Sequence, residues 1–222
     1  NLKKIIKQNL IGISRISSDR LLDELKKLIL SKGFLNILKD KFCKEIITII
    51  FPQLINLNVF NNINDYSKKI FEKKDFIFLI SLLIIDDSDN SEYFIYKYNI
   101  SNEDKKRIKF LSNAYSKNSE KVKFKEKNLW KIFYYNGKNY LNDFINFKIF
   151  QSKKIDKNLI QLKEFFSSKQ TPVLEVKAKT LIEKFNYKEG IELGNKLKEI
   201  EEFWIENSFK ISDKDLNKIV KN

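Results

Sequence analysis

The sequence has no histidine, no methionine, one cysteine, two prolines and only five glycines among its 222 residues. Without histidine, and with Cys43 as its single thiol, the chain cannot form a structural zinc site or use imidazole in acid/base catalysis. A lone thiol also excludes an internal disulfide, so we expect a cytoplasmic protein in a reducing compartment. The scarcity of glycine and proline favours long helices over turn-rich β folds.

The chain also lacks a hydrophobic run long enough to cross a membrane. The longest run, Phe76 to Ile85, falls short of a bilayer span and is flanked by charged residues, so it predicts a buried core helix. Residues 1–6 are amphipathic and have no signal-peptide core. Because there is no initiator methionine, we expect the sequence to begin inside a longer protein, and we expect no membrane partner.

The main property of the residues that are present is an excess of positive charge. Lys and Arg number 43 against 29 Asp and Glu, which gives a formal net charge of +14. Such a surface attracts phosphate and gains from counterion release, so a nucleic acid is the expected partner. A second explanation stays open, because abundant lysine beside only three arginines is also typical of an AT-rich genome, whose codon bias raises lysine everywhere.

Hydrophobic periodicity predicts the fold class. Apolar residues recur at helical spacing almost throughout, which indicates an all-α, irregular array of about 11–14 helices without a sheet. A serine followed by a carboxylate three residues later marks two helix starts, Ser101 with Asp104 and Ser212 with Asp215. The helices are expected at about 18–31, 42–51, 54–71, 75–86, 91–98, 101–115, 125–135, 139–152, 156–168, 177–187, 189–207 and 213–221.

Three segments carry longer motifs, and they follow one another along almost the whole chain. The first is ISSDRLLDEL at 16–25, followed by IFPQL at 50–54. The second is YNISNEDKKR at 98–107. The third is the tail, in which Lys179-Thr180-Leu181 leads to GIELG at 190–194 and then to EEFWIEN at 201–207.

In this order and spacing, the segments resemble the C-terminal half of bacterial class II tRNA nucleotidyltransferases and poly(A) polymerases. That family has Ile-Ser-x-Glu-Arg-Ile and Phe-Pro-Glu-Leu in the first segment, where this chain has Asp19 and Gln53 in place of glutamate. In the tail, Ala178-Lys179-Thr180 stands where the family has Gly-Lys-Asp, and Lys188-Glu189-Gly190 stands where it has Pro-Gly.

The resemblance implies the organisation and the function of the chain. It implies the end of a neck domain at 1–52, a helical body at 53–168 and a helical tail at 169–222. It further implies the tRNA-binding part of a CCA-adding enzyme, without catalytic or metal-binding residues and without a cofactor of its own. The catalytic head, with its Mg²⁺, is expected upstream in the same polypeptide, so this chain alone is predicted to be inactive. A-only or CC-only addition, a poly(A) polymerase and a non-enzymatic RNA-binding or protein-interaction module stay open as alternatives.

Cationic side chains near the motifs are the candidate RNA contacts. A-form RNA is recognised mainly by its shape and its phosphates, so lysine-rich helices suit the acceptor and elbow regions of tRNA. For Arg20 the alternative is an ion pair with Glu24 one turn later, and for the others it is a solvated charged face. The candidate residues are Arg20, Lys105, Lys106, Arg107, Lys177 and Lys179.

Two other features have a functional and a structural interpretation. Asp87 and Asp89 have the spacing of a two-metal site, but they follow a helix and lack an upstream phosphate loop, which favours a simple turn. Four aromatic residues offer stacking surfaces for bases, but their helical spacing favours packing in a core: Trp130, Phe133, Tyr134 and Tyr135.

Overall fold

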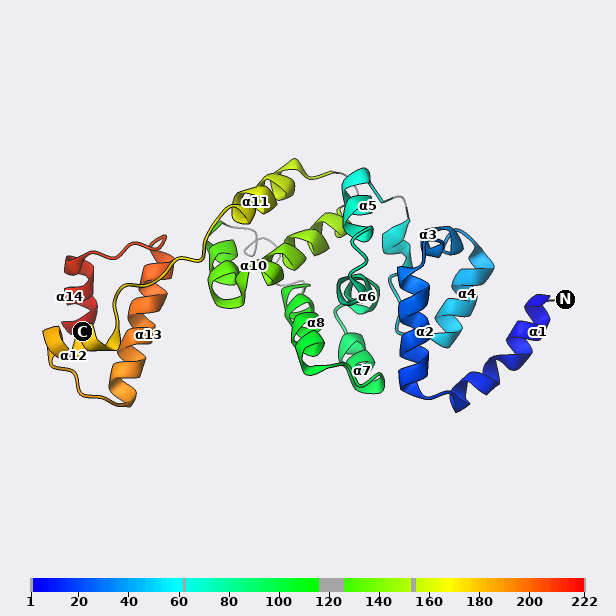
Figure 1. Ribbon diagram of the computed structural model, residues 1–222, viewed down its shortest axis with the longest axis horizontal. Helices are drawn as coiled ribbons and strands as arrows, with labels where there is room; N and C mark the ends of the chain where they lie inside the picture. The colour runs from blue at the N-terminus through cyan, green and yellow to red at the C-terminus, as the bar shows by residue number, and fades with distance from the viewer. Residues whose placement is uncertain (1, 62, 116–125, 153–154, 222) are drawn as a thin grey trace. The chain divides into compact units, whose positions relative to one another are not determined.

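The computed structural model describes residues 2–61, 63–115, 126–152 and 155–221, and within these ranges it confirms an all-α protein. The described residues form thirteen α-helices and two short 3₁₀-helices, and no strand (Figure 1). The elements are α1 (Leu2–Asn9), η1 (Leu10–Arg15), α2 (Ser18–Leu30), α3 (Phe34–Ile37), α4 (Lys41–Ile50), η2 (Leu57–Phe60), α5 (Asp65–Phe71), α6 (Phe76–Ile84), α7 (Asn90–Lys97), α8 (Asn102–Tyr115), α10 (Glu126–Gln151), α11 (Lys157–Ser167), α12 (Ala178–Phe185), α13 (Ile191–Glu206) and α14 (Asp213–Lys221).

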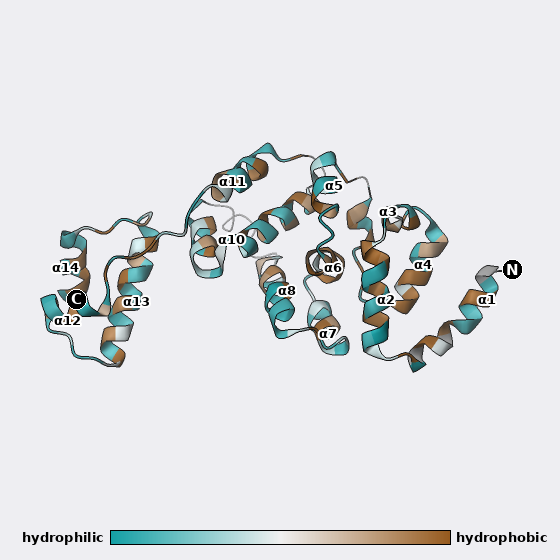
Figure 2. Ribbon diagram, viewed as in Figure 1, coloured by the Kyte–Doolittle hydropathy of each residue, from teal (hydrophilic) through white to brown (hydrophobic). Residues whose placement is uncertain are grey.

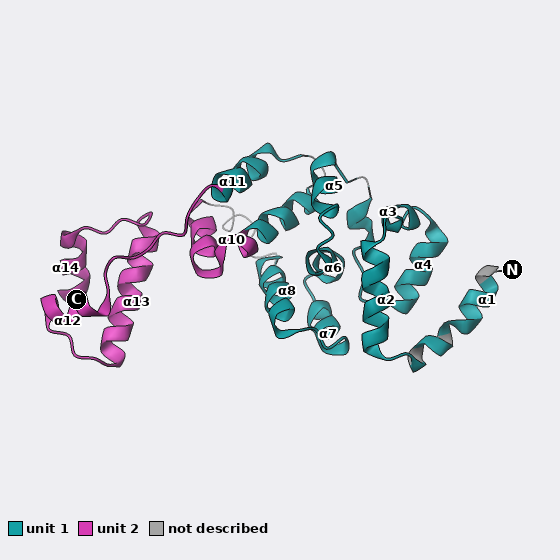
Figure 3. Ribbon diagram, viewed as in Figure 1, with its two compact units in different colours: residues 1–120, 142–167 teal, residues 121–141, 168–222 magenta. Residues whose placement is uncertain are grey.

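The chain divides into two compact units (Figure 3). Unit 1 holds residues 1–120 and 142–167, and unit 2 holds residues 121–141 and 168–222. The chain therefore enters unit 2, returns to unit 1 through α10, and enters unit 2 again after α11. The predicted domain boundaries at 52 and 168, which the family resemblance implies, stay a prediction.

The core of unit 1 is built around α6, as its unbroken apolar sequence predicts. Seven of its apolar side chains are buried, and it contacts α2, α7, α8 and η2. The helix is apolar on nearly every side (Figure 2). Phenylalanine rings extend this core: Phe60 lies 5.6 Å from Phe71 and 6.0 Å from Phe150, measured between ring centroids. Edge-to-face ring pairs of this kind favour a fixed arrangement of the helices that carry them.

Local capping signals place several helix starts correctly. The Asp104 backbone N–H donates to Ser101 Oγ at 3.2 Å, and the Ser101 hydroxyl donates to Asp104 Oδ2 at 2.8 Å. The Asp215 backbone N–H likewise donates to Ser212 Oγ at 3.2 Å, and the Ser212 backbone N–H donates to Asp215 Oδ2 at 3.1 Å. Both serines therefore cap their helices as predicted, and the box at Ser212 has both of its reciprocal bonds. Each serine oxygen satisfies a backbone donor that a helix start would otherwise leave without a partner.

One predicted helix, 54–71, is wrong. The structure has η2 at Leu57–Phe60 and a separate α5 that begins at Asp65. Asn64 explains the break, because its Oδ1 accepts a hydrogen bond from the Ser67 backbone N–H at 2.9 Å and so starts a new helix. The apolar spacing continues across the break, which is why periodicity alone suggested one helix.

The predicted gap between 135 and 139 lies inside α10, where Gly137 interrupts the helix. Its backbone has φ 84° and ψ 176°, a conformation that residues with a Cβ rarely adopt. α10 therefore consists of two helices joined at a kink, the first within unit 2 and the second mainly within unit 1.

Unit 2 has its own apolar core, formed by α12, α13 and α14. The buried side chains of this core are Leu181, Leu193, Ile200, Leu216 and Ile219. Aromatic rings from the first half of α10 add to it: Trp130 lies 5.1 Å from Phe209, and Tyr134 lies 5.5 Å from Trp204. Core packing is thus confirmed for the buried Phe133, while Trp130 and Tyr134 are half-buried against other rings. It is wrong for Tyr135, whose side chain is 53% exposed.

Candidate nucleic-acid interface

Arg20 lies exposed in the first turn of α2. The ion pair with Glu24 that we considered for it does not form, because Glu24 Oε1 pairs instead with Lys27 Nζ at 2.7 Å. Ser17 caps the helix by accepting a hydrogen bond from the Arg20 backbone N–H at 3.5 Å. The exposed position of Arg20 leaves its guanidinium accessible to a ligand from solvent.

Lys105, Lys106 and Arg107 lie near the start of α8, but they differ in exposure. Successive helical residues point about 100° apart, so three neighbours cannot all face one ligand. Lys106 is exposed, whereas Lys105 and Arg107 are half-buried. Of the three, Lys106 is therefore the residue best placed for a phosphate.

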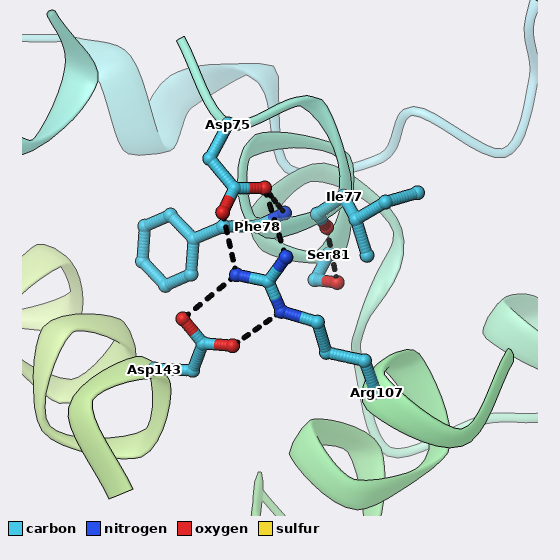
Figure 4. A network of polar contacts seen from close by, with 6 residues as sticks. All are labelled: Asp75, Ile77, Phe78, Ser81, Arg107 and Asp143. Atoms are coloured by element: carbon cyan, nitrogen blue, oxygen red, sulfur yellow. Dashed lines mark hydrogen bonds and ion pairs between the residues drawn. The ribbon is translucent and has the colours of Figure 1, made fainter. Parts of the chain in front are cut away.

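Arg107 is held between two carboxylates that come from distant parts of the sequence (Figure 4). Its Nη1 and Nη2 donate to the two oxygens of Asp75 at 3.0 and 2.6 Å. Its Nη2 also donates to Asp143 Oδ1 at 2.9 Å, and its Nε donates to Asp143 Oδ2. Four of the five guanidinium N–H groups are thereby used, which leaves little capacity for the predicted phosphate contact.

These contacts join three helices of unit 1. Asp75 is also the N-cap of α6, since its Oδ1 accepts from the Phe78 backbone N–H at 3.1 Å, while Arg107 belongs to α8 and Asp143 to α10. We call Asp75, Arg107 and Asp143 the arginine clamp. Its place among the core helices gives Arg107 a structural role.

Burial and charge oppose each other in the arginine clamp. Burial disfavours the charged guanidinium, but its hydrogen bonds to Asp143 and Asp75 outweigh this and raise the pKa of Arg107. Burial also raises the pKa of Asp143, while the hydrogen bond from Arg107 acts in the opposite direction. The charged state of Asp143 thus depends on Arg107.

Sequence reasoning missed the arginine clamp, although one signal was available. A chain that uses lysine for almost every cation retains arginine at position 107, and only arginine presents the planar fork that can bind two carboxylates at once. The partners themselves are 32 and 36 residues away, so no local pattern links them to Arg107.

Lys177 and Lys179 lie at the start of α12 in unit 2, and both are exposed. Lys179 Nζ lies 3.6 Å from Glu183 Oε1 one helical turn later, an exposed pair of small energetic value. Lys177 lines a groove together with Lys198 and the apolar side chains Val173 and Leu197. The groove has a cationic side, but Glu201 also lines it and reduces its positive charge.

The remaining acidic candidate forms a turn. Asp86 Oδ1 accepts from the backbone N–H and the hydroxyl of Ser88, at 3.0 and 2.6 Å, and Ser88 Oγ accepts from the Asn90 backbone N–H at 3.1 Å. These bonds join α6 to α7 through four bent residues, as the structural interpretation predicts.

The candidate cations are divided between the two units. Arg20, Lys105, Lys106 and Arg107 belong to α2 and α8 of unit 1, whereas Lys177 and Lys179 belong to unit 2. Neither models of known protein families nor the curated proteins give a match to this sequence. The described helices include none that is both long and apolar enough to cross a membrane.

Proposed function

We propose that this chain is the tRNA-binding, C-terminal helical part of a nucleotidyltransferase that extends RNA 3′ ends. The all-α fold supports the proposal, as does the charge of the chain, because both compact units carry more Lys and Arg than Asp and Glu. The family-like motifs at the starts of α2, α8 and α12 are the reason to prefer this function among RNA-binding functions.

The observation that carries the proposal is the amount of cationic surface that the fold leaves uncompensated. Most lysines in the described ranges have no carboxylate within 4.0 Å, including the exposed Lys106 and Lys177. Lysine on rigid helices is suited to phosphates at fixed separations, which is how a protein recognises folded RNA by shape. The chain would therefore hold the acceptor and elbow regions of tRNA.

In this proposal the chemistry belongs to a separate catalytic head. That head would bind Mg²⁺ and the incoming nucleotide, while the helices fix the distance between the tRNA elbow and the reacting 3′ end. CCA addition is the activity that we propose for the complete protein. Poly(A) addition by the same architecture would use the same C-terminal contacts.

The RNA half of the proposal is tested by titrating the purified chain with a tRNA transcript over a salt series. We expect the logarithm of the association constant to fall linearly with the logarithm of salt, with a slope of roughly −0.7 to −0.9 per phosphate contacted. Lys106→Gln and Lys177→Gln are each expected to reduce the slope by about 1, whereas Lys27→Gln, whose lysine is already paired, should leave it nearly unchanged. Affinity that does not depend on salt would refute RNA as the partner.

The enzymatic half is tested independently by the sequence encoded upstream of Asn1. A glycine-rich loop followed by an Asp-x-Asp pair would agree with a nucleotidyltransferase head, and any other domain would contradict it. The complete protein should then add CMP and AMP to a tRNA that lacks its 3′ end. Addition of AMP alone, in long tracts, would identify a poly(A) polymerase instead.

A further inference from the structure

The structure contains a cationic groove that none of the sequence motifs indicates. It lies in unit 1 between α1 and the start of α4, and we call it the α1–α4 groove. It is lined by Lys4, Lys7, Gln8, Lys41, Phe42 and Glu45. Lys4, Lys7 and Gln8 share one face of α1 because they are three and four residues apart, and Lys41 and Glu45 share one face of α4.

One ion pair joins the two helices of the groove, and the other two lysines of the groove are unpaired. Lys7 Nζ lies 2.5 Å from Glu45 Oε1, which joins α1 to α4. Lys4 and Lys41 are exposed, and no carboxylate of the described residues lies within 4.0 Å of either amine. Since three cations face one anion, the groove keeps an excess of two positive charges.

The position of Lys4 in its helix is unfavourable without a ligand. It lies in the first turn of α1, which has no acidic side chain, and the positive end of the helix dipole repels a cation there. Lys41 begins α4, whose N-cap Asp40 already places a carboxylate at that helix start by accepting from the Cys43 backbone N–H. The flanking Gln8 can donate an amide N–H, so the groove contains donors but only one carboxylate. A neighbouring anion would relieve the repulsion and use these donors.

We propose that the α1–α4 groove binds the phosphate backbone of an RNA duplex. This inference rests on the proposed function, because two unpaired lysines beside a paired one select polyanions in general and the RNA partner is taken from that proposal. Lys4 and Lys41 would each contact a phosphate, and Gln8 would donate to a phosphate or a 2′-hydroxyl. Lys7 would remain paired with Glu45 and position the two helices.

The first test compares two double variants with the same change of charge. K4Q/K41Q removes the unpaired lysines of the groove, and K32Q/K157Q removes two other exposed lysines of unit 1. The probe is a short blunt RNA duplex. In K4Q/K41Q, the slope of the logarithm of the association constant against the logarithm of salt should be shallower by about two than in the wild type, and the control variant should change this slope far less. Between about 50 and about 200 mM salt, the affinity of the groove variant should therefore fall about tenfold less than that of the wild type.

The second test adds charge to the groove. Glu45→Gln releases Lys7, so it should tighten binding and steepen the slope by about 1. Asp65→Asn, which releases Lys68 from an exposed pair at 3.0 Å on α5, is the matched control and should have a smaller effect. This gain of affinity keeps the inference testable even if K4Q/K41Q proves unstable.

The outcomes separate the groove from the general function. If the wild type binds the duplex and K4Q/K41Q has the same slope and affinity as K32Q/K157Q, the groove inference is overturned while the proposed function stands. If the wild type binds no RNA, both fail. If polyglutamate displaces the duplex from the wild type as effectively as unlabelled RNA does, an acidic protein is the better partner and the inference is again overturned.

Discussion

Replacing Arg107 with alanine should strongly destabilise unit 1. The substitution removes all four hydrogen bonds of the arginine clamp and leaves two carboxylates near each other without their cation. Asp143 is the more seriously affected, because its side chain is only 10% exposed, whereas that of Asp75 is 40% exposed and can be solvated. The cost arises mainly from an uncompensated, buried negative charge on Asp143.

The expected magnitude follows from this burial. Removing one partner of a fully buried ion pair costs about 3 to 5 kcal/mol of unfolding free energy. Arg107 is itself 25% exposed, and the contact with Asp75 is partly screened, so we expect the lower end of that range, about 3 kcal/mol. Lys106→Ala, which changes the exposed neighbour on the same helix, should change the unfolding free energy by less than about 0.5 kcal/mol.

The assay is urea unfolding followed by far-ultraviolet circular dichroism in acidic and neutral buffer. The folded pKa of Asp143 is already raised by burial, and losing Arg107 raises it further. A carboxyl with a raised folded pKa contributes stability below its unfolded pKa and loses it as pH rises through the folded pKa. The difference in unfolding free energy between the wild type and Arg107→Ala should therefore be small in acid and largest at neutral pH.

A double variant provides the internal check. In Arg107→Ala/Asp143→Asn the buried charge is absent. The double variant should therefore lose less unfolding free energy than the sum of the losses in Arg107→Ala and Asp143→Asn. A single variant that unfolds within about 0.5 kcal/mol of the wild type at neutral pH would refute the structural role of Arg107. It would also return Arg107 to the set of free cations available for RNA.

Two further substitutions test backbone and capping geometry. Gly137→Ala should cost about 1 to 3 kcal/mol in the same unfolding assay, because φ 84° and ψ 176° disfavour a Cβ, whereas the helical Gly194→Ala should be neutral or stabilising. Ser212→Ala should raise the pKa of Asp215, which hydrogen bonds from Ser212 hold below its ordinary value. A carboxyl with a lowered folded pKa contributes stability that is lost as pH falls. The unfolding free energy of Ser212→Ala should therefore decrease less on acidification than that of the wild type. Carboxyl NMR titration checks the shift, and an unchanged pKa would contradict the capping contact.

Features with a local cause were predictable from the sequence. The run from Phe76 to Ile85 has no polar face, so it has to be buried, and the serine boxes at Ser101 and Ser212 specify their helix starts within four residues. The interruption near Gly137 was also visible, because Asn-Gly punctuates the helical pattern. Each of these predictions depends only on neighbours in the chain.

The features that were missed depend on residues far apart in the chain. The pairing of Arg107 with Asp75 and Asp143, and that of Lys7 with Glu45, are decided by how the helices pack. The family-like motif around position 107 suggested an RNA contact, while the packed structure engages that guanidinium internally. Asn64 shows the limit at short range too, because one side-chain cap outweighs continuous apolar spacing.

The route of the chain between the two units determines how the protein can be dissected. A fragment that begins at Ser168 would contain α12, α13 and α14 but would lose residues 126–141, whose Trp130 and Tyr134 cover Trp204 and Phe209. It would also lose Lys131, which pairs with Glu206 at 3.0 Å. A single cut near the end of α11 would thus expose the aromatic rings of Trp204 and Phe209 in the C-terminal fragment, and exposed apolar surface of this kind promotes aggregation. Unit 2 can be studied alone only if the first half of α10 is supplied with it, for example as an added peptide.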